Sequence, residues 1–180
     1  VAPWRDGKAV MVTIEDTDLT VRTISDNLSA TTPDLVFRAM APDAGNIFSP
    51  TRATLATLPA ENMLHVGFTA SRTISSGTDT EVYSVVRDST TGGAFVGPDR
   101  INFNSAFPTG NPTNQDHVSI AIDPISKRVL AAYSSVESAL GQGYETVYIS
   151  LYNQTTKSWG TSTDLSVFDP ATGRTVLVEL

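Results

Sequence analysis

The sequence repeats one arrangement of short alternating segments at an offset of 65 residues. Apolar and polar residues alternate within these segments, which is typical of β-strands that turn one face toward a core. Val118, Ile120 and Ile122, for example, fall on one face of such a segment, and Ser119 and Ala121 fall on the other. Almost no stretch shows the 3.6-residue period of a helix. The repeat therefore predicts an all-β fold in which one supersecondary unit is used at least twice.

Each copy is predicted to hold four strands joined by turns, which form an antiparallel meander. The two stretches superpose without a gap and share strand order, turn positions and loop length. A few residues are also identical, among them the pairs Pro59 and Pro124, Tyr83 and Tyr148, and Asp99 and Asp164. The predicted strands of the first copy are residues 52–58, 63–71, 81–88 and 94–103, and those of the second copy are 116–123, 128–135, 145–153 and 158–168.

The two ends of the chain carry further strand patterns. Residues 8–40 contain three predicted strands with an acidic hairpin turn at 16–18, and they look like a third unit that lacks its first strand. The C-terminal strand is expected to begin a unit of a longer chain, or to pair with the N-terminal unit or with another subunit. We therefore divide a single all-β domain or fragment, residues 1–180, into a partial unit (1–48), two full units (49–104 and 114–169) and a terminal strand (170–180).

The turn after the third strand of each copy resembles the aspartate box of sialidase-type β-propellers. That motif reads Ser-x-Asp-x-Gly-x-Thr-Trp and joins the third and fourth strands of a blade. One copy here reads Tyr152-Asn-Gln154-Thr-Thr156-Lys-Ser158-Trp159, and the other reads Asp88-Ser-Thr90-Thr-Gly92-Gly-Ala94-Phe95; both lack the motif's Asp. The resemblance covers about residues 50–168 and implies blade-like meanders that form part of a β-propeller. The alternative is a β-sandwich in which the 65-residue repeat is accidental.

Composition argues against several classes of function. A net charge of −7 makes the chain a poor polyelectrolyte for nucleic acid and disfavours docking onto anionic membranes. No apolar run approaches the roughly 18 residues of a membrane-spanning helix. The absence of cysteine excludes disulfides, zinc ribbons, iron–sulfur sites and thiol catalysis. We therefore expect no nucleic-acid partner, no membrane insertion, no metal and no cofactor.

A histidine in front of an inner strand is the best candidate for catalysis. Propeller-like polysaccharide lyases and related carbohydrate-active proteins often carry an Asp-His pair at such a place, and Asp116-His117 looks similar. The resemblance implies a histidine that faces the central channel and acts as a general base. Arg52 occupies the corresponding place in the other copy, and Tyr144 could supply a phenol. The alternative is that Asp116 simply orients a surface histidine; His65, in mid-strand, is expected to be structural.

Aromatic side chains in loops suggest a binding role, because the apolar faces of sugar rings stack on them. Trp4, Trp159, Tyr144 and Phe107 are the candidates here, and core packing is the alternative for these aromatic rings. Arg52 and His117 are further candidate ligand-binding residues. We expect a non-catalytic structural or recognition module of a secreted, cell-surface or virion or tail assembly, with carbohydrate as its ligand. Other subunits, or the rest of a longer chain, are the expected partners. A carbohydrate-active enzyme of the lyase or glycosidase type and an oligomeric shell or filament subunit stay open as alternatives.

Overall fold

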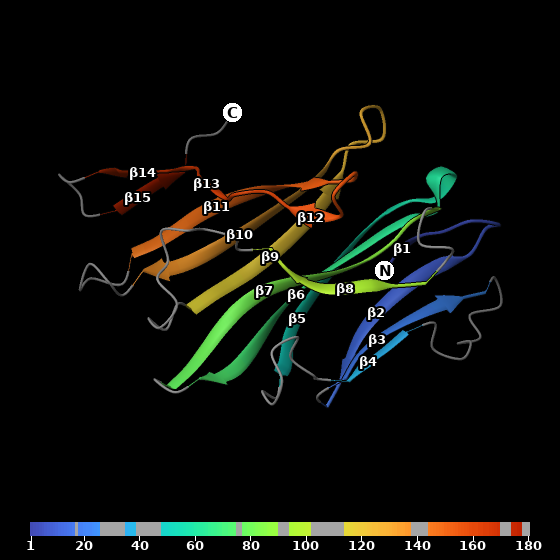
Figure 1. Cartoon of the computed structure of the whole chain (residues 1–180), viewed down its shortest axis with the longest axis horizontal. Helices are drawn as coiled ribbons and strands as arrows, with labels where there is room; N and C mark the ends of the chain where they lie inside the picture. Colours follow the sequence, from blue (N-terminus) through green and yellow to red (C-terminus); the bar gives the residue numbers. More distant parts are fainter. Residues whose placement is uncertain are drawn as a thin grey trace.

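A computed structural model describes residues 1–16, 18–25, 35–38, 48–74, 77–89, 94–101, 114–137, 144–169 and 174–177. In this part of the chain the strands form three sheets, and they pair in antiparallel fashion apart from one parallel bridge between Thr80 and Asn114 (Figure 1). The described segments include a 3-10 helix, η1 (Pro59–Glu61). The predicted all-β, antiparallel fold is confirmed. None of the helical structure in the described segments is long and apolar enough to cross a membrane.

The N-terminal sheet contains four strands in the order β1-β2-β3-β4. The three strands predicted in residues 8–40 are present, and the acidic hairpin turn joins two of them, with Glu15 opposite Asp18. A first strand is present as well, because Ala2 and Pro3 pair with Val10 and Ala9. Two residues are too few to show an alternating pattern, so sequence analysis missed this strand. The strands are β1 (Ala2–Pro3), β2 (Ala9–Glu15), β3 (Asp18–Ile24) and β4 (Leu35–Arg38).

The two copies of the repeat form two meanders with the same strand order. In the first meander β5, β6, β7 and β8 pair in sequence, and in the second β9, β10 and β11 pair in sequence, with β12 and β13 both on β11. Apart from the fourth strand of the second copy, the predicted strands of the two copies are found within a few residues of their expected ends. Their bounds are β5 (Phe48–Leu58), β6 (Met63–Ile74), β7 (Gly77–Arg87), β8 (Val96–Arg100), β9 (Asn114–Ile122), β10 (Val129–Glu137), β11 (Tyr144–Asn153), β12 (Ser158–Trp159) and β13 (Thr163–Asp164).

Backbone irregularities recur at equivalent places. The register of β5 against β6 shifts between Pro50 and Arg52, and β9 shifts against β10 around His117, which lies 65 residues after Arg52. The turn between the first two strands also holds a residue with positive φ in each unit: Gly7 at 71° in the N-terminal sheet, Asn62 at 53° in the first meander and Lys127 at 59° in the second. Such details are set locally, so their recurrence shows that the two copies share one backbone plan.

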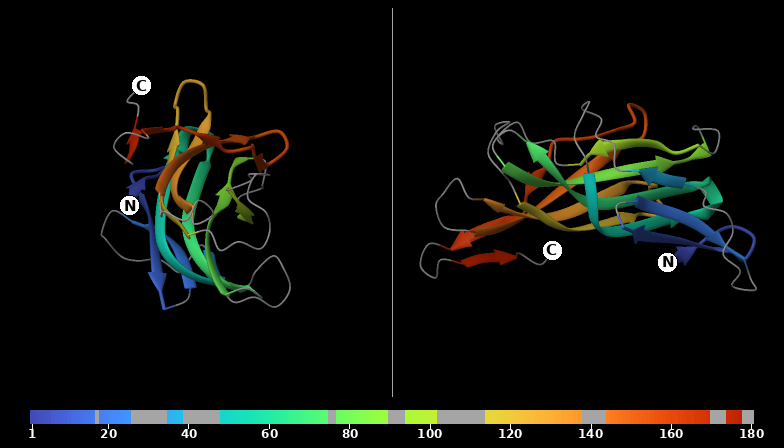
Figure 2. Two further views of the ribbon diagram at one scale, coloured as in Figure 1. Left: turned by 90° about the vertical axis from the view of Figure 1, so that its left-hand side faces the viewer. Right: turned by 90° about the horizontal axis from the view of Figure 1, so that it is seen from below.

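The first meander is the middle layer of the molecule. Residues 63–70 of β6 are all buried, which requires cover on both faces, because successive side chains of a strand point to opposite sides. Val66 and Phe68 belong to a core shared with Val10 and Leu19 of the N-terminal sheet. Met63 belongs to a second core, shared with residues of the second meander. Figure 2 shows the N-terminal sheet (blue) at one end of the molecule, beside the first meander, and the second meander (yellow to orange) beyond the first.

The contact between the two meanders is close. A Cβ at Gly67 would lie 2.7 Å from Cδ1 of Ile120, so β6 and β9 approach at a position where only glycine fits without adjustment. At the rim of the interface, Lys127 forms an ion pair of 2.6 Å with Glu61, and Lys157 pairs with the buried carboxylate of Asp88. The meanders therefore pack face to face over a common apolar core.

One predicted strand proves to be divided. Residues 158–168 were expected to form a single fourth strand of the second copy, but β12 and β13 are separated by the segment around Gly160, whose N–H bonds to the carbonyl of Leu151. The chain then leaves this sheet: β14 (Ser166–Asp169) pairs with β15 (Arg174–Leu177), and both contact β11. The predicted C-terminal strand exists, and its partner within the described structure is β14.

Candidate functional site

Two of the predicted site residues, Arg52 and His117, lie on the first strands of their meanders. Both side chains are exposed. Their exposure is explained by the register shifts described above, because a β-bulge turns a side chain out of the regular alternation. His117 has a φ of 55°, an uncommon conformation for a residue with a side chain. Arg52 and His117 are 65 residues apart in the sequence and hold corresponding positions in the two meanders, whose first strands, β5 and β9, are in contact.

The remaining part of the predicted Asp-His-Tyr group lies outside what the structure describes. Asp116 and Tyr144 are strand residues of β9 and β11, but their side chains do not belong to the described part. Phe107 and residues 138–143 are not described either. A general-base role for His117 with Asp116 and Tyr144 thus stays a prediction.

Trp159 lies elsewhere. Its strand, β12, is separated from β9 by β11 and β10, so the two are about 14 Å apart across the sheet. The indole is 6% exposed, packs edge-on against Tyr152 with ring centroids 5.2 Å apart, and donates a hydrogen bond of 2.6 Å to Ser84 Oγ of the first meander. The structure therefore places this ring in the core between the meanders and does not bring it together with Arg52 and His117.

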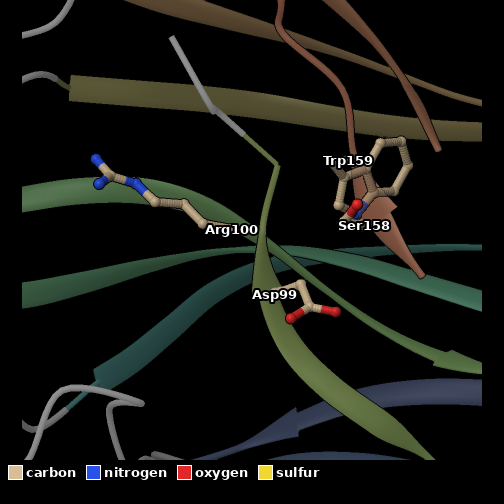
Figure 3. A pocket seen from close by; sticks show the side chains of 4 residues that line it. All are labelled: Asp99, Arg100, Ser158 and Trp159. Carbon is tan, nitrogen blue, oxygen red and sulfur yellow. The ribbon is translucent and has the colours of Figure 1, made fainter. Parts of the chain in front are cut away.

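An edge of the Trp159 side chain still borders a pocket. The pocket has a volume of about 310 Å³ and is lined by Asp99 and Arg100 of β8 and by Ser158 and Trp159 of β12. It lies where the last strands of the two meanders meet, and Figure 3 shows Asp99, Ser158 and Trp159 gathered on one side of β8. The arrangement combines a carboxylate, a hydroxyl and an aromatic surface, which are the groups that bind a polyhydroxylated ligand.

Asp99 is the group of this pocket with the most distinctive electrostatics. Partial burial raises the pKa of its carboxyl above the ordinary value. No hydrogen bond or ion pair from another described side chain reaches this carboxylate, whereas Ser158 Oγ is already 2.8 Å from Thr156 Oγ1. Behind the pocket, burial raises the pKa of Tyr152 to about 12, and the negative charges of Asp99 and Asp88 act in the same direction. A ligand hydroxyl or amine donating to Asp99 would supply the solvation that the carboxylate lacks.

Arg100 does not act with Asp99. Neighbouring residues of a strand point to opposite faces, and Figure 3 shows the Arg100 side chain directed away from the other three. Its guanidinium pairs with Glu81, a carboxylate that is fully buried in β7 and that also accepts a hydrogen bond of 2.5 Å from the Tyr83 hydroxyl. Arg100 therefore contributes to the fold, and only part of its surface lines the pocket.

His65 is structural, as its sequence position indicated. It is 1% exposed and lies edge-on to Tyr152, with ring centroids 4.8 Å apart. Burial lowers the pKa of its imidazole to about 4, a shift that the nearby Asp88 opposes and Lys157 reinforces. The described residues contain no group of three or more histidines and carboxylates that could hold a metal ion.

Asp99 and Ser158 were not recognised as site residues in the sequence. The one signal was the identity of Asp99 with Asp164 at the 65-residue offset, which marks a repeated position without saying what it faces. Neither a known family model nor a curated protein matches this chain. The chemistry of the pocket therefore has to be argued from its own residues.

Proposed function

We propose that the chain is a stack of β-propeller-type blades that acts as a non-catalytic recognition module for carbohydrate. Support for the blades comes from two meanders of equal strand order packed face to face, with β5 beside β9 and β8 beside β12. The four-stranded N-terminal sheet, on the other side of the first meander, adds to this support. Propeller blades pack in the same succession around an axis. A sandwich would explain the stacking of any two layers, but it would not require the shared bulge positions.

The observation that carries the proposed ligand class is the Asp99 carboxylate beside the edge of Trp159. Sugars offer hydroxyl donors next to apolar C–H faces, so a pocket with an acceptor, a hydroxyl and an indole edge suits one or two sugar units. The Thr-rich, Lys-poor composition without cysteine fits a secreted, cell-surface or virion setting, where glycans are met.

Binding to a glycan array, followed by a titration of the best glycan, tests this proposal. Asp99→Asn keeps the shape of the side chain but removes the charge, and we expect it to weaken binding by about tenfold or more, as loss of a charged hydrogen bond does. Asp6→Asn is the matched control, because Asp6 is exposed in a turn of the N-terminal sheet at a φ of 58° that asparagine accepts. Wild-type protein that binds no glycan would contradict the proposal.

A second candidate function, a carbohydrate-active enzyme, is favoured by a separate observation. His117 is exposed at a bulge of an inner strand, and bulges often direct side chains into active sites. If the chain cleaves a polysaccharide, His117→Ala should abolish turnover while the unfolding midpoint stays close to that of the wild type. Retained activity would remove His117 from the mechanism.

A further inference from the structure

The pocket beside Asp99, which we call the Asp99 pocket, is built at the contact of the two meanders. Asp99 lies opposite Ser84 in the pairing of β8 with β7, and residues directly opposite each other in an antiparallel pair share one face of the sheet. Ser84 Oγ accepts the indole N–H of Trp159 at 2.6 Å, so this face is the one that meets the second meander. The packing of the meanders therefore brings the Asp99 carboxylate and the edge of Trp159 together, and Figure 3 shows both on one side of β8.

The two cations that adjoin the pocket residues in the chain are engaged elsewhere. Arg100 follows Asp99 on β8, but its side chain is directed to the opposite side and pairs with the fully buried Glu81. Lys157 directly precedes β12, and its ammonium pairs with the buried carboxylate of Asp88. Each of these positive charges is thus balanced by a carboxylate of its own.

Asp99 therefore brings an unbalanced negative charge to the pocket. Its carboxyl is partly buried, so it has lost part of its hydration, and no described side chain donates to it in return. The sequence segments on either side of β8, residues 90–95 and 102–113, contain no charged residue that would alter this balance. A ligand that brings a positive charge with N–H donors compensates the lost hydration, whereas a ligand that brings a second carboxylate is repelled.

We propose that the sugar unit bound in the Asp99 pocket is a hexosamine with a free amino group, whose ammonium donates to the Asp99 carboxylate while the apolar face of the ring lies against the edge of Trp159. The inference rests on the proposed carbohydrate binding and names the class of sugar. A pocket volume of about 310 Å³ accommodates a unit of this size. The net charge of −7 adds a long-range attraction for cationic glycans and disfavours glycans rich in uronic acid or sulfate.

Calorimetric titration of the chain with three disaccharides at pH 6.5 tests the proposal. The first is a β-1,4-linked disaccharide of glucosamine, whose amino groups, like an α-amino group, are mostly protonated at this pH. The second is its N-acetylated form, which has the same rings without the charge, and the third is a disaccharide of galacturonic acid. We expect the glucosamine disaccharide to bind at least about tenfold more tightly than the N-acetylated one, because hydrogen bonds between charged groups are the stronger ones. The galacturonic acid disaccharide should not bind.

Variants of Asp99 identify the group that selects the amine. Asp99→Asn keeps the shape of the side chain without its charge and should abolish the preference for the glucosamine disaccharide. Asp99→Glu keeps the charge and should retain a preference. Asp6→Asn is the matched control, because it changes the net charge by the same amount at an exposed turn of the N-terminal sheet and should bind as the wild type does. Thermal unfolding establishes that the variants fold, and the comparison of the three sugars on the wild type needs no variant.

The outcomes separate this inference from the proposed function. If the N-acetylated or the galacturonic acid disaccharide binds as tightly as the glucosamine disaccharide, the inference is overturned and carbohydrate recognition stands. A preference for the amine that survives in Asp99→Asn also overturns it, because another group would then select the charge. A chain that binds none of the three disaccharides but binds another glycan of the array overturns the inference alone, whereas a chain that binds no glycan at all contradicts the proposed function as well.

Discussion

The indole nitrogen of Trp159 donates a 2.6 Å hydrogen bond to Ser84 Oγ and so joins the last strand of one meander to the third strand of the other. Both residues are buried. Ser84→Ala leaves the indole N–H without its acceptor, and we expect a loss of about 1–3 kcal/mol in the free energy of unfolding. Urea unfolding measures this loss. In a Trp159→Phe background, which has no donor, Ser84→Ala should cost clearly less, and equal costs in both backgrounds would mean that the bond does not stabilise the fold.

The contact of Gly67 with Ile120 predicts a specific pattern of rescue. In Gly67→Ala the new methyl group meets Ile120 Cδ1 at 2.7 Å, and such overpacking costs about 1–3 kcal/mol. Ile120→Val removes that carbon. Unfolding of the double variant should therefore show a higher stability than the sum of the two single effects. Strict additivity would contradict the face-to-face packing of β6 on β9.

The buried imidazole of His65 makes stability depend on pH. Its pKa is about 4 in the folded protein and 6.5 as the ordinary value, so between these values the unfolded chain binds more protons than the folded one. The stabilising contribution is present above about pH 6.5 and is lost as the pH falls toward 4, by about 3 kcal/mol at most.

Measurement of unfolding at pH 7 and at pH 4.5 checks this sign. His65→Phe keeps an aromatic ring against Tyr152 and should lose less stability on acidification than the wild type. His117→Gln, which changes an exposed histidine, should behave as the wild type does. A pH dependence that is the same in His65→Phe would show that other groups cause it.

Two ion pairs of the chain differ in burial, and we expect them to differ in how much they contribute to the free energy of unfolding. Arg100→Met removes the charge partner of the fully buried Glu81, and we expect a cost of about 3–5 kcal/mol in unfolding free energy. Arg22→Met breaks a pair of 3.3 Å with the exposed Glu15 and should cost about 0–1 kcal/mol. Replacement of Glu81 by Gln in the Arg100→Met protein should recover part of the loss. Similar costs for the two arginine variants would contradict the placement of Glu81 in the interior.

Strand order could be predicted because alternation and turns are local properties of the sequence. The shared plan of the two copies, with turns at Pro59 and Pro124, is of this kind. What could not be predicted is which sheet face meets which. The approach of Gly67 to Ile120, and of Asp99 to Trp159, arises from packing between units and leaves no pattern within either segment. Trp159 shows the consequence: its type suggested a sugar-stacking platform, and its ring lies mostly in the core.

The central claim is that the two meanders pack face to face through β6 and β9, and a disulfide tests it most directly because the chain has no cysteine of its own. A Cβ at Gly67 would lie 3.0 Å from Ile120 Cγ1, which puts it within about 4.5 Å of Ile120 Cβ and in the range of natural disulfides. The account predicts that Gly67→Cys/Ile120→Cys forms an intramolecular disulfide under mild oxidation, seen by mass spectrometry as loss of both thiols. Gly67→Cys/Ser119→Cys, with the second cysteine on the opposite face of β9, should keep its thiols free. Free thiols in the first protein, or equal cross-linking in both, would contradict the account.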